Sequence, residues 1–187
     1  LAYAVMDRVS GGAIGFHRNA VSETIRKALA NSSDVERLVM SSFQKVSDIY
    51  LLGRSLHFPV ALEGALKMKE LAYVHAEGIA AGELKHGPLA LMDTNALVIV
   101  LNLQDKTYTD TLSSAHEVKA RGAKIIGISN VENEIYDAMI RIPSMKSEML
   151  YPLAEIIPLQ LISYYLALQN NADPDFPRNL AKSVTVR

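Results

Sequence analysis

Residues 96–101 read Ala-Leu-Val-Ile-Val-Leu, an unbroken apolar run that is too short to make a good helix. A run of this kind is typical of a strand that is buried on both faces of a sheet. Residues 49–52 (Ile-Tyr-Leu-Leu) and 124–129 (Lys-Ile-Ile-Gly-Ile-Ser) have the same character, and residues 139–142 predict a fourth strand. Strands that are buried on both faces indicate a parallel sheet with helices on each side.

Helical segments are predicted between these strands. A helix with Pro59 in its first turn is expected to reach about His75, and residues 107–121 predict another. Residues 153–169 predict a largely apolar helix, which Pro158 should bend or delay. The alternation predicts a three-layer α/β domain, in which ligands bind beyond the carboxyl ends of the strands, where loops such as residues 53–55 lie. Upstream of the strands, residues 21–30 and 35–46 predict two further helices.

Composition excludes several classes of function. The chain has 187 residues, a formal net charge of −1 and no cysteine, so disulfides, thiolate catalysis and cysteine-ligated metals are excluded. Nothing in that charge favours binding to nucleic acid or to an anionic membrane. No run approaches the ~18 apolar residues of a membrane span, and residues 1–16 do not resemble a secretory signal. A cytoplasmic protein is expected, and the absence of an initiator Met suggests part of a longer one.

One predicted helix carries a line of three charged residues and a valine. Glu63, Lys67, Glu70 and Val74 are spaced at i, i+4, i+7 and i+11, and therefore share one helical face. Glu70 is a candidate general base, and Lys67 is a candidate cation that keeps it ionised or helps to move protons. The alternative is a solvated stripe whose ion pair contributes only ~0.3–0.5 kcal/mol.

Two further side chains have the chemistry of a sugar-converting site. His86, before Gly87 and Pro88, is expected on a loop, where an imidazole can act as acid or base near neutral pH. Lys182 lies in a C-terminal segment of little charge, where burial would lower its pKa and allow it to condense with a carbonyl. A loop histidine with one hydrogen bond, and a tail docked only for packing, are the alternatives.

No cofactor or metal is expected. The sequence contains no dinucleotide-binding fingerprint after a strand, no Walker-type loop and no Gly-x-Ser-x-Gly elbow. The remaining histidines show no convincing metal-ligand spacing, and they are interpreted as structural or surface residues: His17, His57, His75 and His116.

Three segments together resemble the C-terminal half of the glucosamine-6-phosphate synthase family, the isomerizing glutamine–fructose-6-phosphate aminotransferases. They are residues 61–70 (ALEGALKMKE), 81–91 (AGELKHGPLAL) and 177–186 (PRNLAKSVTV). The resemblance covers nearly the whole chain, and the last segment is the most specific, because other sugar isomerase (SIS) domains generally lack it. It implies a flavodoxin-like SIS fold with a five-stranded parallel sheet, in a homodimer.

The resemblance also implies roles for four residues in making glucosamine 6-phosphate from fructose 6-phosphate and glutamine-derived ammonia. Glu70 would move the proton between C2 and C1 of the open-chain sugar, and Lys67 would support that transfer. His86 would open the sugar ring from across the dimer interface. Lys182 would form the Schiff base with the sugar ketone.

The chain departs from the whole enzyme of that family. It lacks the cysteine-dependent glutaminase and the upstream SIS subdomain with its Ser/Thr-rich phosphate loop, so the isolated chain is expected not to synthesise the product. We expect connecting helices at residues 1–47, the SIS domain at 48–170 and a catalytic tail at 171–187. The alternatives are a deglycase or phosphosugar isomerase of the same fold, or a non-catalytic sugar-phosphate-binding module.

Overall fold

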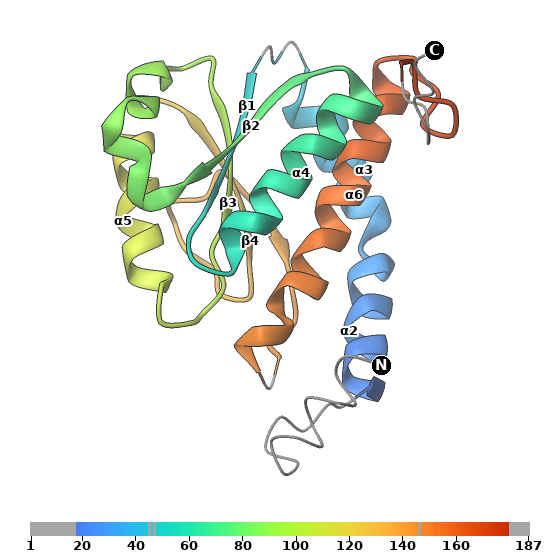
Figure 1. The fold of residues 1–187 in the computed structure, drawn as a ribbon, viewed down its shortest axis with the longest axis horizontal. Helices are drawn as coiled ribbons and strands as arrows, with labels where there is room; N and C mark the ends of the chain where they lie inside the picture. Colours follow the sequence, from blue (N-terminus) through green and yellow to red (C-terminus); the bar gives the residue numbers. More distant parts are fainter. Residues whose placement is uncertain (1–17, 45, 47, 146, 180–187) are drawn as a thin grey trace, which may run out of the picture.

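The computed structural model describes residues 18–44, 46, 48–145 and 147–179 of the chain. Its helices lie on both sides of a central sheet (Figure 1). The elements, in chain order, are α2 (Arg18–Ala30), α3 (Ser32–Ser42), β1 (Asp48–Gly53), α4 (His57–Ala72), β2 (His75–Ala80), the 3₁₀ turns η1 (Ala81–His86) and η2 (Pro88–Leu91), β3 (Leu97–Leu101), α5 (Tyr108–Lys119), β4 (Lys124–Ser129), β5 (Ala138–Arg141), the 3₁₀ turn η3 (Glu148–Leu150) and α6 (Tyr151–Gln169).

The sheet has five strands in the order β2-β1-β3-β4-β5, and every neighbouring pair is parallel. The central strand β3 is buried along its whole length, as expected from its apolar run. The predicted α/β fold with a parallel sheet is therefore confirmed. The residue patterns alone did not identify β2, because its sequence HAEGIA alternates in burial and contains a glycine.

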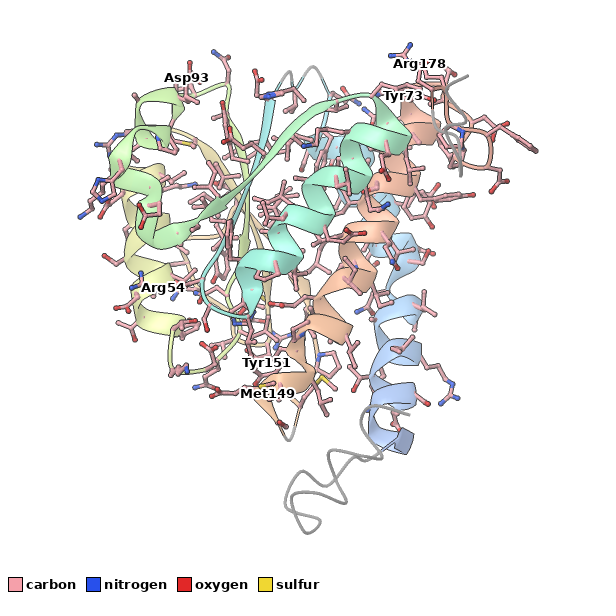
Figure 2. All side chains as sticks on the ribbon, in the orientation of Figure 1. Arg54, Tyr73, Asp93, Met149, Tyr151 and Arg178 are labelled. Atoms are coloured by element: carbon pink, nitrogen blue, oxygen red, sulfur yellow. The ribbon has the colours of Figure 1, made fainter. Side chains whose placement is uncertain are left out.

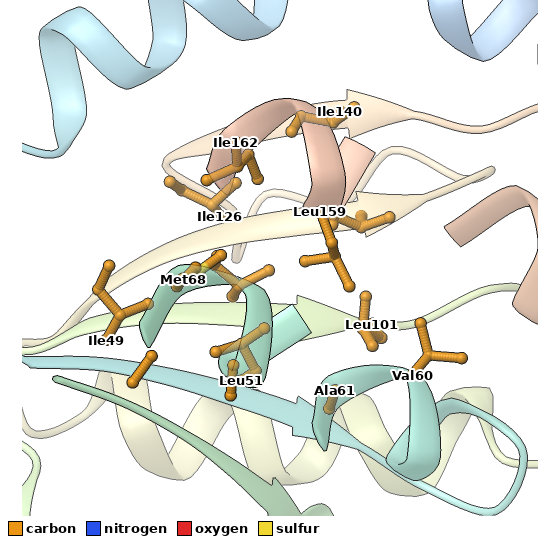
Figure 3. Packing of buried hydrophobic residues seen from close by; sticks show 14 of the residues in the cluster. Ile49, Leu51, Val60, Ala61, Met68, Leu101, Ile126, Ile140, Leu159 and Ile162 are labelled. Atoms are coloured by element: carbon orange, nitrogen blue, oxygen red, sulfur yellow. The ribbon is translucent and has the colours of Figure 1, made fainter. Parts of the chain in front are cut away.

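Two hydrophobic cores lie on the two faces of the sheet. On one face, Leu51 of β1, Met68 of α4 and Leu159 of α6 belong to a single buried cluster, which Figure 3 shows at close range. On the other face, Val98 of β3 packs in a second cluster with Val118 of α5. Burial of apolar side chains on both faces explains why β1, β3 and β4 are apolar along most of their length rather than alternating.

The two upstream helices also cover the first face. α2 and α3 pack along α6 (Figure 1), and Val35, Val39 and Phe43 belong to the same buried cluster as the strands. α3 thus shares the core of the sheet, whereas α2 packs on α6 and α3. The division at residue 47, and the tail from residue 171, stay predictions; residues 1–17 and 180–187 lie outside the described residues.

Helix ends differ from their predicted positions. α3 ends at Ser42 rather than near residue 46. α4 ends at Ala72, because Tyr73 adopts a left-handed conformation with φ 58°. Val74 therefore lies beyond the helix, and the predicted line ends at Glu70. α6 begins at Tyr151 and runs through the buried Pro158 without a later start.

Gly53 closes β1 where the chain turns sharply into α4. A Cβ atom there would lie 2.4 Å from the His57 carbonyl oxygen and 2.8 Å from the Phe58 nitrogen. These are backbone atoms in the first turn of α4, so they cannot rotate away. Gly53→Ala is expected to lower the free energy of unfolding by about 1–3 kcal/mol, measured by urea unfolding of the chain.

Gly82→Ala is the matched control for this substitution. Its nearest neighbour is the guanidinium of Arg54, 3.3 Å from the added Cβ, and that group sits at the end of a flexible side chain. The control should change stability by no more than about 0.5 kcal/mol. Equal losses in the two variants would contradict the steric explanation.

Candidate active site

The predicted catalytic helix runs between the two ends of the sheet. α4 starts after the carboxyl end of β1 and finishes before β2, whose first residue, His75, pairs with Asp48 at the start of β1. Its last turn therefore lies at the amino ends of the strands. Figure 2 shows Arg54 and Tyr73 far apart, at opposite ends of the sheet. The ligand loop expected at residues 53–55 and the predicted base Glu70 thus lie in two different places.

Lys67 and Glu70 form a close pair in the last turns of α4. Lys67 Nζ lies 2.5 Å from Glu70 Oε2 and 3.7 Å from Glu63 Oε1. The Lys67 and Glu70 side chains are 29% and 24% exposed, so water screens this pair less than a pair at the open surface. The contact with Glu70 raises the pKa of Lys67 against the opposing effect of burial. Lys67 thus keeps its charge beside a carboxylate that is partly exposed.

The chain returns to this end of α4 near its C-terminus. The backbone N–H of Arg178 donates to the Tyr73 hydroxyl oxygen at 2.8 Å, and the Arg178 guanidinium lies 3.9 Å from the centre of the Tyr73 ring. Figure 2 shows these two residues together. Lys182 is four residues further on and lies outside the described residues. Arg178, four residues before Lys182, therefore lies next to the end of the helix that carries Glu70.

His86 is exposed at the end of η1, just before Gly87, whose φ of 135° favours glycine. Its neighbour Lys85 pairs with Glu117 of α5 at 2.9 Å, which ties this turn to the second face of the sheet. Among the described residues, no hydrogen bond or ion pair joins His86 to Lys67 or Glu70. Within one chain, His86 is thus a separate exposed group.

A buried ionisable cluster lies at the carboxyl end of the sheet, and sequence analysis missed it. His57 Nε2 lies 3.1 Å from Asp105 Oδ2, and its Nδ1 lies 2.7 Å from Glu155 Oε1. The three side chains are 1%, 2% and 0% exposed. The Glu155 contact has the distance but not the direction of a hydrogen bond. Only the polar side chain of His57, ahead of the apolar residues FPVAL in the first turns of α4, could have suggested such a cluster.

Burial and close contacts shift the pKa of each group in the cluster. Burial raises the pKa of Asp105, but hydrogen bonds from the Thr107 hydroxyl and N–H, with the contact to His57, outweigh burial and lower it. Burial lowers the pKa of His57, but Glu155 and Asp105 together outweigh burial and raise it. Burial raises the pKa of Glu155. The lowered pKa of Asp105 and the raised pKa of His57 thus favour an ion pair between them, whereas burial disfavours the charged form of Glu155.

The described part of the chain holds no group of three His, Cys, Asp or Glu side chains suited to a metal ion. In the same residues, no helix is long and apolar enough to cross a membrane.

A model of the SIS domain matches residues 42–169. The chain belongs to the SIS-domain family. The match covers all five strands and helices α4 to α6, including Lys67, Glu70 and His86.

Several relatives of this SIS-domain chain share one name. An isomerizing glutamine–fructose-6-phosphate aminotransferase of Methanosarcina mazei is 47% identical over 162 residues, which are 84% of this chain and 26% of that protein. One of Thermococcus kodakarensis is 44% identical over 168 residues, 89% of this chain and 28% of that protein. The chain thus spans about a quarter of the length of the curated relatives it matches.

Two solved structures are similar to this chain. The C-terminal domain of glucosamine-fructose-6-phosphate aminotransferase from Francisella tularensis matches with a TM-score of 0.77 and 34% identity, over 82% of this chain and 44% of that chain. A tagatose-6-phosphate ketose/aldose isomerase from Escherichia coli has a TM-score of 0.75 at 21% identity, over 89% and 47% of the two chains. The second likeness shows the shared fold alone.

Proposed function

We propose that this chain is the C-terminal half of the isomerase region of a glutamine–fructose-6-phosphate aminotransferase. In the full-length polypeptide it would help to convert fructose 6-phosphate and ammonia, released from glutamine, to glucosamine 6-phosphate. The observation that carries the proposal is the half-buried Lys67–Glu70 pair, with Arg178 docked on Tyr73 in the turn that follows the same helix. The names of relatives at 44% and 47% identity support it.

The chemistry requires an amine and a mobile proton. The Lys182 amine adds to the C2 carbonyl of the open-chain sugar, and loss of water leaves an imine. Ammonia displaces the lysine amine and leaves the sugar imine at C2. Removal of a proton from C1 gives an enolamine. Delivery of that proton to C2, with loss of the O1 hydroxyl proton and gain of one proton by the nitrogen, then gives the C1 aldehyde and the C2 amine. This isomerisation needs no oxidant, since the electron pair moves within the sugar.

Glu70 is suited to the proton transfer between C1 and C2. A carboxylate that is only partly exposed can accept a proton from carbon and return it to the neighbouring atom. Lys67 would hold that carboxylate in place through the 2.5 Å contact. The described tail supports a meeting of Lys182 with Glu70, because four residues of chain span at most about 14 Å.

Other parts of the site would come from outside this chain. His86 is exposed, which fits an action on the ring oxygen in a partner subunit of a homodimer. An upstream SIS subdomain would hold the phosphate, and a glutaminase domain would supply ammonia. A cytoplasmic location fits the phosphorylated substrate. Neither a deglycase nor a non-catalytic module accounts as well for the names of the relatives.

Borohydride trapping tests the proposal. The full-length polypeptide that carries this chain is incubated with fructose 6-phosphate and borohydride, and peptide mass spectrometry locates the adduct. We expect reduction of the imine to leave a hexitol phosphate on Lys182, with no adduct in a Lys182→Arg variant. Reversible binding of the sugar without an adduct would favour the non-catalytic module. The isolated chain is expected to form neither adduct nor glucosamine 6-phosphate, since it lacks the phosphate loop.

A further inference from the structure

Tyr73 has an unusual backbone conformation for a bulky residue. Its φ of 58° and ψ of 33° lie in the left-handed region, which side chains other than glycine, asparagine and aspartate rarely adopt. Two of the other three non-glycine residues with positive φ in the described chain are asparagines, Asn171 and Asn179. Strain of this kind persists where the surrounding structure requires it, and it often marks a functional position. Glycine would end the helix here without strain.

The strained conformation coincides with two contacts between Tyr73 and Arg178. The hydroxyl oxygen accepts the Arg178 N–H, and the ring carries the guanidinium on its face. The residues are 105 positions apart. A glycine at position 73 could make neither contact, so the tyrosine has a role in addition to ending α4. We call this pair the Tyr73–Arg178 latch.

The segment that leads to Arg178 is itself held in place. The Asn170 side-chain amide donates to the carbonyl of Ala72, the last residue of α4, at 3.0 Å. Asp173 Oδ1 accepts the backbone N–H groups of Asp175 at 2.9 Å and Phe176 at 3.3 Å. The chain therefore leaves α6, folds into a compact turn beside the end of α4, and reaches Tyr73 in a defined direction.

The latch lies next to the proposed proton-transfer residue. Glu70 precedes Tyr73 by three residues, which corresponds to about 4.5 Å along a helix axis. On the other side, Lys182 follows Arg178 by four residues, or at most about 14 Å of chain. We infer that Tyr73 and Arg178 position the C-terminal segment so that Lys182 meets the substrate beside Glu70. This inference rests on the proposed function.

Substitution of Tyr73 by glycine tests whether Tyr73 positions the C-terminal segment, because the variant should lose activity without losing much stability. Glycine accepts the left-handed conformation freely, so the variant should unfold at a urea concentration close to that of the wild type. The latch is nevertheless lost, and in the full-length polypeptide kcat should fall about 10- to 100-fold, because misplaced reacting groups lose rate of this order. KM for fructose 6-phosphate should change little, since the phosphate is held elsewhere. The initial rate of borohydride trapping on Lys182 should fall in parallel with kcat.

Three further measurements make the test specific. Tyr73→Phe keeps the ring under Arg178 and should retain more activity than Tyr73→Gly. Hydrogen exchange of the Arg178 amide should quicken in both variants, because both lose the accepting oxygen. Tyr164→Leu, at an exposed tyrosine of α6 that lies outside the latch, is the control and should leave the kinetics unchanged.

The outcomes distinguish this inference from the proposed function. If the wild type forms no adduct on Lys182, the proposed function fails and the positioning role fails with it. If the wild type forms the adduct and Tyr73→Gly traps it equally fast, the latch is overturned and the proposed function stands. An Arg178 amide that exchanges equally fast in the wild type and in Tyr73→Phe would also overturn the latch.

Discussion

Replacing Glu70 by glutamine in the full-length polypeptide is expected to lower kcat for glucosamine 6-phosphate synthesis by about 10²- to 10⁴-fold. Glutamine has nearly the shape of glutamate and can still accept a hydrogen bond from Lys67, but it cannot take up the C1 proton. KM for fructose 6-phosphate should change little. Steady-state kinetics at saturating ammonia measure the effect without involving the glutaminase reaction.

The same variant should still form the imine. Condensation of Lys182 with the sugar ketone does not depend on the C1 proton, so borohydride should continue to trap the adduct in Glu70→Gln. Glu23→Gln is the matched control, because Glu23 also pairs with a lysine on a helix, Lys27 at 3.1 Å, but is 60% exposed. Full activity of Glu70→Gln would show that another group moves the proton.

Replacing His57 by leucine is expected to lower the free energy of unfolding by about 3–5 kcal/mol. The substitution removes the cation that lies 3.1 Å from Asp105 and 2.7 Å from Glu155, and it leaves both carboxyl groups buried. Uncompensated charge inside a protein is much more costly than the loss of an exposed ion pair. Urea unfolding of the chain measures the effect.

Two companion variants test this explanation. His75→Leu is the control, because His75 lies 2.7 Å from Asp48 but is 63% exposed, and it should cost no more than about 1 kcal/mol. Adding Glu155→Leu to His57→Leu should restore part of the lost stability, since the second substitution removes a buried polar group that lacks a partner. Equal losses for His57→Leu and His75→Leu would refute a stabilising buried cluster.

The loss in His57→Leu should also depend on pH. The pKa of His57 is raised in the folded chain: burial opposes the rise, but Glu155 and Asp105 outweigh it. A group of this kind stabilises the fold fully below its unfolded pKa of about 6.5, and its contribution disappears as pH rises through the folded pKa. The stability difference between the wild type and His57→Leu should therefore be largest below about pH 6.5 and shrink at alkaline pH. A difference that grows with pH would contradict the raised pKa.

Much of the fold followed from local pattern. Apolar runs predicted β1, β3, β4 and β5 within one or two residues. β1, β3 and β4 are buried along nearly their whole length, whereas β5 is only partly buried and ends in the exposed Arg141. The same pattern does not predict β2, because its residues alternate between exposed and buried positions. The sequence pattern also predicts an end of α4 near His75, whereas the helix ends at Ala72. Nothing local indicates that a tyrosine will adopt a left-handed conformation.

The candidate site was only partly predictable. The pairing of Lys67 with Glu70 could be read from the sequence, because residues three positions apart on a helix are neighbours. The candidate roles of His86 and Lys182 came from side-chain chemistry and from a family resemblance, and they stay proposals.

The sequence by itself determined the parallel α/β architecture, the Lys67–Glu70 pair and the membership of the SIS-domain family. These depend on the periodicity of side chains along single elements and on short motifs. Only the tertiary structure decided that His57 lies between Asp105 and Glu155, and that Arg178 docks on Tyr73. The partners in these contacts are 48 to 105 positions apart, so they meet only when the sheet and its helices pack together.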